Sequence, residues 1–213
     1  MQVIDNTAVK MTVPEYMVPH IQKEIDKFEV VGQKGNLSEV VIYWGVEEMT
    51  RLNQLVSFRS PLPSPIIRDY DWPGVFAPFD HQKTTSEFLS INKRGFCFNE
   101  AGTGKTSSAL WSADYLMKLG LIKRVLIICP LSIMYSAWEA DVQNTVMHRT
   151  IGVAHGTQKK RELIIEEPFD FVCINYDGVG IVRETIAKNN FDLIIIDEAN
   201  AYKNPQTNRW KII

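Results

Sequence analysis

Residues 99–106, Asn-Glu-Ala-Gly-Thr-Gly-Lys-Thr, join two segments whose hydrophobic patterns differ. Residues 94–99 alternate apolar side chains closely enough to predict a short buried strand. Residues 105–120 place apolar side chains three or four positions apart and end at a glycine, which predicts a helix. Gly102 and Gly104 have no Cβ, so the backbone can curl there and point its N–H groups toward an anion. The stretch therefore predicts a phosphate-binding loop at the start of a helix.

The last residues of this loop carry groups suited to a nucleoside triphosphate. The backbone of Gly102, Thr103 and Gly104 would contact the phosphates, and the helix N-terminus adds the positive end of its dipole. Lys105 would reach the β- and γ-phosphates, and the Thr106 hydroxyl would ligate Mg²⁺.

A second stretch, Phe-Asp-Leu-Ile-Ile-Ile-Asp at residues 191–197, is almost continuously apolar and predicts a strand covered on both faces. An acid at the carboxyl end of such a strand lies where open α/β sheets place their ligands. Asp197 would hold Mg²⁺ through a water molecule. Glu198 adds a second carboxylate that can orient and deprotonate an attacking water. Lys105, Asp197 and Glu198 are therefore the candidate catalytic residues.

Each stretch also has a plainer interpretation. Asn99 stands where the pattern G-x-x-x-x-G-K-[ST] has its first glycine, so a glycine-rich turn that binds nothing is one alternative. A strand that simply ends at an Asp-Glu turn is the other. The two stretches occur together in one chain, which favours a site for ATP and Mg²⁺.

The chain is predicted to hold an α/β domain behind a small α+β unit. Strand-like runs at 125–129 and 169–174 lie between the two stretches, so a central parallel sheet flanked by helices is expected in residues 76–213. Residues 1–56 contain two strand-like segments and two helical ones, including 46–55, and are either a recognition unit or a packing appendage. Proline-rich residues 57–75 read as an extended connector.

Together these motifs resemble those of the Swi/Snf-like helicase-translocases of helicase superfamily two. Residues 99–106 resemble motif I of that family, and 126–132 with Trp138-Glu139 resemble motif Ia. Residues 172–177 are similar to the family's strand that ends in a polar residue and a tyrosine. Residues 197–204 resemble motif II with its trailing Lys-Asn, although Asn200 stands where Asp or His closes the motif.

The resemblance implies a RecA-like P-loop fold and a helicase-type ATP hydrolase. Residues 79–82 are similar to the family's Q motif, so Gln82 would select adenine. The turn at Pro130, Leu131 and Ser132 would touch a nucleic-acid backbone, with duplex DNA the favoured partner. That contact would be sequence-independent and sensitive to salt.

The resemblance also implies a second RecA-like domain that carries arginine fingers, and the chain ends at Ile213, shortly after motif II. We therefore expect that domain outside this chain. An absent arginine finger costs about a thousandfold or more in rate, so the chain alone would hydrolyse ATP poorly. Residues 208–213 have the pattern of a helix.

Composition narrows the classes of protein. The N-terminus has no secretory pattern, and no apolar run approaches the roughly 20 residues that cross a bilayer, so no membrane partner is expected. Cys97, Cys129 and Cys173 lie in predicted core strands, which favours free thiols in the cytoplasm or another reducing compartment. The net charge of −2 excludes a protein that coats nucleic acid with a strongly basic surface. The basic run 159–161 is expected to be a solvated helix face.

Two functions remain open at the level of sequence. The leading hypothesis is an ATP-driven motor that moves on nucleic acid. The alternative is a nucleotide-regulated module that switches a partner-binding surface without translocation. The motor is favoured because residues 130–132 and the trailing Lys203-Asn204 have no purpose in a simple switch.

Overall fold

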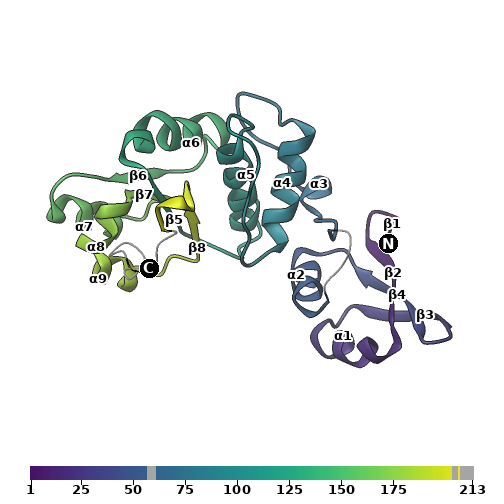
Figure 1. The fold of residues 1–213 in the computed structure, drawn as a ribbon. Helices are drawn as coiled ribbons and strands as arrows, with labels where there is room; N and C mark the ends of the chain where they lie inside the picture. Colours follow the sequence, from purple (N-terminus) through teal and green to yellow (C-terminus); the bar gives the residue numbers. More distant parts are fainter. Residues whose placement is uncertain (57–60, 203–205, 207–213) are drawn as a thin grey trace. The chain divides into compact units, whose positions relative to one another are not determined.

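A computed structural model describes residues 1–56, 61–202 and 206. Figure 1 shows the course of the chain, which forms two compact units. The first unit comprises Met1–Asp71 and Phe79–Thr103, and the second comprises Trp72–Pro78 and Gly104–Ile213. Part of the predicted connector (57–60), the trailing residues 203–204 and the predicted helix at 208–213 lie outside the described residues.

The first unit contains an antiparallel sheet with the strand order β1-β2-β4-β3. Its strands are β1 (Gln2–Ile4), β2 (Ala8–Pro14), β3 (Phe28–Lys34) and β4 (Leu37–Tyr43). Strand β4 alternates as a half-buried strand should, with Ser38, Val40 and Ile42 on the buried face. This alternation determines which face of the sheet packs against helices.

The helices of the first unit differ in how much they bury. They are η1 (Glu15–Met17), α1 (Val18–Glu24), α2 (Val46–Leu55), α3 (Ile66–Asp69) and α4 (Asp80–Ile91). Of these, α2 and α4 bury the most residues. Helix α2 has the bounds that its periodicity predicts, and it buries Val46, Met49 and Leu52 at intervals of three. Helix α4 packs near α3, and its Ser90 hydroxyl forms a buried hydrogen bond of 2.7 Å with the hydroxyl of Ser64, two residues before α3 begins.

The predicted strand at 94–99 is wrong. These residues follow α4 without a strand assignment, and Phe96 and Phe98 are 74% and 89% exposed and stack on each other. Alternating apolar residues become a strand only when a neighbouring strand satisfies their backbone N–H and C=O groups. Among the described residues, no strand pairs with this segment.

The second unit is built on a parallel sheet with the order β6-β7-β5-β8, which confirms the predicted α/β class. Its strands are β5 (Val125–Cys129), β6 (Ile151–Ala154), β7 (Phe171–Asn175) and β8 (Leu193–Ile196). Every residue of β5 and β7 is buried, as expected for the two strands that have a neighbour on each side.

Strand β8 differs from its prediction. It was expected to be covered on both faces, yet Ile194 is 51% exposed. Within the described part of the chain β8 pairs with β5 alone, which makes it an edge strand of this sheet. An apolar run indicates burial but does not by itself distinguish a central strand from an edge strand.

Helices flank this sheet. They are α5 (Lys105–Lys118), α6 (Ala140–Thr145), α7 (Gln158–Glu166), α8 (Tyr176–Ile181) and α9 (Arg183–Lys188), with short 3-10 turns η2 (Leu131–Ile133) and η4 (Ala199–Tyr202) and a π-helical turn η3 (Met134–Glu139). Helix α5 agrees with its prediction, and Gly120 just beyond it adopts φ 72°. None of the described helices combines the length and apolar character that a bilayer span requires.

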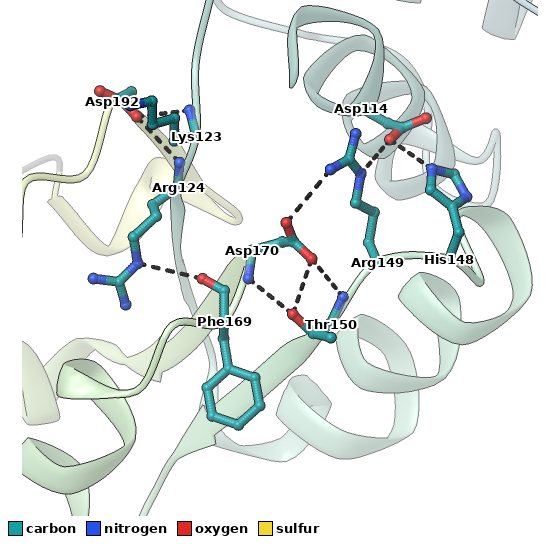
Figure 2. A network of polar contacts seen from close by, with 9 residues as sticks. All are labelled: Asp114, Lys123, Arg124, His148, Arg149, Thr150, Phe169, Asp170 and Asp192. Carbon is teal, nitrogen blue, oxygen red and sulfur yellow. Dashed lines mark hydrogen bonds and ion pairs between the residues drawn. The ribbon is translucent and has the colours of Figure 1, made fainter. Parts of the chain in front are cut away.

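Polar contacts lock the amino ends of the parallel strands (Figure 2). Arg149 donates to Asp114 on α5 at 2.5 Å and to Asp170 before β7 at 3.4 Å. The Asp192 carboxylate accepts the backbone N–H groups of Lys123 and Arg124, just before β5. These contacts hold α5 and the strands in register at the edge opposite to the one where the strands end.

Candidate functional site

The carboxyl edge of the parallel sheet gathers three of the segments that the sequence singles out. Pro130 directly follows β5, Tyr176 follows β7 and Asp197 follows β8. The backbone N–H of Asp197 donates to the Ile128 carbonyl at 2.9 Å and so extends the β5–β8 ladder by one bond. The predicted metal ligand and the predicted nucleic-acid turn therefore begin at neighbouring strand ends.

The Asp197 carboxylate is held by one hydrogen bond on each oxygen. The indole Nε1 of Trp138 donates to Oδ2 at 3.1 Å, and the backbone N–H of Glu198 donates to Oδ1 at 2.9 Å. Trp138 is 2% exposed and comes from the π-helical turn η3. Because both oxygens are engaged, the carboxylate keeps a single orientation.

Tyr176 contacts the backbone of the turn at Asp197-Glu198. Its hydroxyl donates to the Asp197 carbonyl and lies 3.2 Å from the Glu198 carbonyl oxygen. Glu198 adopts φ 52°, a left-handed conformation that costs a non-glycine residue about 1 kcal/mol. Burial, with the Asp197 charge as a smaller cause, raises the pKa of the Tyr176 hydroxyl, which therefore stays protonated and available as a donor.

Both predicted metal ligands have the donor chemistry that Mg²⁺ prefers. Asp197 offers carboxylate oxygens, each of which retains a second lone pair, and Thr106 offers a hydroxyl oxygen. Within the described ranges, no three His, Cys, Asp or Glu side chains gather as a closed metal cage. Mg²⁺ commonly uses one or two protein oxygens and keeps several waters, so this donor set suits it.

The predicted phosphate loop has a left-handed backbone conformation at its two glycines. Gly102 and Gly104 adopt φ 75° and 74°, in the left-handed region that favours glycine. Gly104 is the N-cap of α5, so Lys105 and Thr106 are its first two residues. Their N–H groups lie among the four at a helix start that have no intrahelical acceptor, which suits an anion. The sequence boundary between the two units falls at Thr103-Gly104, inside this loop.

Gln82, predicted to select adenine, contacts the phosphate loop. Its Oε1 accepts the Phe79 N–H at 2.9 Å, and its Nε2 donates to the Thr103 carbonyl at 3.4 Å. His81, to which the sequence assigned no role, also contacts that carbonyl at 3.0 Å through Nε2. The structure thus brings Gln82 and Thr103 together. No signal in the sequence identifies His81, because its partner is a backbone oxygen.

The predicted nucleic-acid turn leads into η3. Leu131 and Ser132 lie in the short turn η2, where Leu131 is half exposed. The following residues place Tyr135 on the surface, with its ring 6.1 Å from that of His155. Trp138 and Tyr176 lie within predicted motifs, but the sequence alone did not indicate that either contacts Asp197.

The basic run at 159–161 is not one solvated face, and that expectation is corrected. Lys159 and Lys160 are exposed, whereas Arg161 is buried. Its guanidinium donates to the carbonyls of Ala154 and Gly156 and to Asn175 Oδ1. Burial lowers the pKa of Arg161 from its ordinary value. Arg161 therefore ties α7 to the ends of β6 and β7.

Comparisons with known proteins agree with this architecture. The family model for the SNF2-related domain matches residues 17–213. The uncharacterized ATP-dependent helicase YqhH of Bacillus subtilis (strain 168) is 27% identical over 143 residues, which are 65% of this chain and 24% of that protein. The SWI2/SNF2 ATPase core of Sulfolobus solfataricus, solved in complex with dsDNA, superposes with a TM-score of 0.56 and 29% identity. That match covers 66% of this chain and 30% of the archaeal chain.

Proposed function

This chain belongs to the SNF2-related domain family, and from that premise we propose that it is the ATP-binding part of an ATP-dependent helicase that moves on nucleic acid. Its parallel α/β unit matches the RecA-like fold of the SNF2 ATPase core. The chain spans less than a third of the length of both relatives, so we assign the complete reaction to the full-length protein. We also propose a second RecA-like domain outside residues 1–213.

One observation carries the proposal: the acidic pair Asp197-Glu198 is held at the carboxyl edge of the sheet by Trp138 and Tyr176. An acidic pair at this edge is suited to hold Mg²⁺ and to activate water. The orientation of Asp197 is restrained by a hydrogen bond on each of its oxygens. Such restraint favours catalysis because little reorganisation is needed when charge develops.

The remaining roles follow from chemistry. Lys105 binds the β- and γ-phosphates, and the backbone of 102–104 wraps them. Asp197 and Thr106 hold Mg²⁺, which when bound neutralises charge on the transferred phosphoryl group. Glu198 orients the attacking water and takes its proton. Gln82 contributes to recognition of adenine.

Duplex DNA is the proposed track, supported by the archaeal structure solved with dsDNA. Pro130, Leu131 and Ser132 would contact its sugar-phosphate backbone. Three free cysteines, two of them buried, support a cytoplasmic or other reducing compartment. The alternative of a nucleotide-regulated switch gains no support from the relatives.

Lys105→Ala in the full-length protein tests the proposal. Loss of one charge-stabilising group should lower ATP turnover by about 100-fold or more and stop triplex displacement on duplex DNA. Lys118→Ala, at the exposed far end of the same helix, is the matched control and should retain both activities. Glu198→Gln should bind ATP and fail to hydrolyse it. Continued turnover and displacement by Lys105→Ala would refute the assigned site.

A further inference from the structure

Trp138 differs from the other buried tryptophans in what its indole contacts. Trp44 and Trp111, buried to a similar degree, donate their Nε1–H to the backbone carbonyls of Pro63 and Pro73 at 2.9 and 2.8 Å. Trp138 donates instead to a carboxylate, that of Asp197, 59 positions further along the chain. A buried indole N–H needs an acceptor, but a backbone carbonyl normally suffices.

The acceptor changes what this bond can do. A hydrogen bond to a carboxylate is roughly twice as strong as one between neutral groups. It also fixes a side chain that could otherwise rotate, whereas a backbone carbonyl is already fixed. With the Glu198 N–H on Oδ1, the indole on Oδ2 leaves Asp197 one orientation and its remaining lone pairs for a metal or water.

The element that supplies Trp138 is unusual. It lies in η3, a π-helical turn over Met134–Glu139, and such turns are rare and often occur at functional sites. The turn places Trp138 in the core with 2% of its surface exposed, while Tyr135, three positions earlier, is 49% exposed. The indole is thus packed rigidly, as a group that orients another must be.

We propose that Trp138 is a positioning residue, which orients the Asp197 carboxylate for the metal that accompanies the nucleotide. This inference rests on the proposed function, since it takes Asp197 as a metal ligand. Trp138 touches neither nucleotide nor metal in this scheme. It acts through Asp197, as partners that hydrogen-bond metal ligands do.

Trp138→Phe in the full-length protein tests the inference, because it keeps an aromatic ring and removes the N–H donor. Loss of a bond that orients a metal ligand typically costs 10- to 100-fold in metal affinity. We expect the Mg²⁺ concentration for half-maximal ATP turnover to rise about tenfold. Binding of a fluorescent ATP analogue should weaken in Mg²⁺ and stay unchanged in EDTA, which gives a readout that does not depend on turnover.

Trp111→Phe is the matched control. It removes the same N–H donor from an equally buried tryptophan whose acceptor is the Pro73 carbonyl. It should lower stability comparably and leave the Mg²⁺ midpoint unchanged. Equal Mg²⁺ midpoints for the two variants would overturn the inference. If Lys105→Ala abolishes turnover but Trp138→Phe and Trp111→Phe have the same Mg²⁺ midpoint, only the role of Trp138 is refuted. If Lys105→Ala keeps its turnover, the proposed function is refuted as well.

A measurement without a tryptophan substitution guards against misfolding of Trp138→Phe. In the ¹⁵N-labelled protein, Asp197→Asn should move one indole N–H resonance strongly, since that proton loses a charged acceptor. The same resonance should move in the unaltered protein when Mg²⁺ and ATP are added. The inference is overturned if no indole resonance responds to Asp197→Asn, or if the one that responds ignores Mg²⁺ and ATP.

Discussion

Replacing Arg161 by methionine should destabilise the second unit strongly. The guanidinium makes three hydrogen bonds, from Nε to Gly156 O at 3.0 Å and from Nη1 to Ala154 O at 2.7 Å and Asn175 Oδ1 at 2.8 Å. Hydrogen bonds to a charged group contribute about 1.5–3 kcal/mol each, so the gross loss is roughly 4.5–9 kcal/mol.

Two effects reduce that figure. Burial penalises the charged guanidinium, as its lowered pKa shows, and methionine removes this penalty. Methionine also restores apolar packing. We expect a net loss of about 3 kcal/mol in the free energy of unfolding, at the upper end of the cost of leaving one buried neutral acceptor unsatisfied.

Urea unfolding followed by circular dichroism measures this loss. With a slope of about 2 kcal/mol per molar urea, a loss of roughly 3 kcal/mol lowers the midpoint by about 1.5 M. Lys159→Met makes the same exchange of cation for methionine on the exposed face of α7 and should change the free energy by about 0.5 kcal/mol at most. A shift for Arg161→Met no larger than that of Lys159→Met would refute the reasoning.

Gly178 provides a second approach to the same contact. A Cβ placed on Gly178 would lie 2.3 Å from Arg161 Nη1 and 2.9 Å from Asn175 Oδ1. Gly178→Ala should therefore destabilise, although alanine is otherwise about 1 kcal/mol better than glycine within a helix. In the Arg161→Met background its cost should fall, and a double-mutant cycle should show coupling of about 1 kcal/mol or more. Strictly additive effects would mean that the two residues do not interact.

Arg149→Met breaks the bridge in Figure 2 between Asp114, whose side chain is 2% exposed, and Asp170. We expect a loss of about 2 kcal/mol in thermal or urea unfolding, between the values for exposed and fully buried pairs; Arg183→Met on the exposed face of α9 is the control and should change little. Asp141→Asn addresses pH dependence. Burial raises the pKa of Asp141, so the folded state holds this proton more tightly than the unfolded state, and Asp141 lowers stability progressively as pH rises above 3.8. Melting temperatures measured from acidic to neutral pH should show a smaller decline, or a larger rise, for Asp141→Asn than for the parent; parallel curves would contradict this assignment.

Local requirements explain why much of the candidate site could be predicted from sequence. The turn at Gly102 and Gly104 needs left-handed backbone, which glycine alone adopts without strain, so its conformation is written into two residues. Helix α5 follows from its periodicity, and the buried runs at β5 and β7 indicate a covered parallel sheet. Each of these signals is contained in a short stretch of chain.

Long-range packing decided the rest. Residues 94–99 have a strand-like pattern but form no strand, because no strand among the described residues pairs with them. Arg161 stands in a run of cations yet is buried, because α7 carries it over the ends of β6 and β7. Trp138 and Tyr176 hydrogen-bond to Asp197 although they lie 59 and 21 positions away in the chain. The carboxyl ends of β5, β7 and β8 bring these residues together. The sequence by itself indicates candidate residues for a nucleotide site, because residue types and short spacings can be read along the chain. Only the tertiary structure determines which side chains orient them, because a hydrogen bond depends on distance in space rather than along the chain.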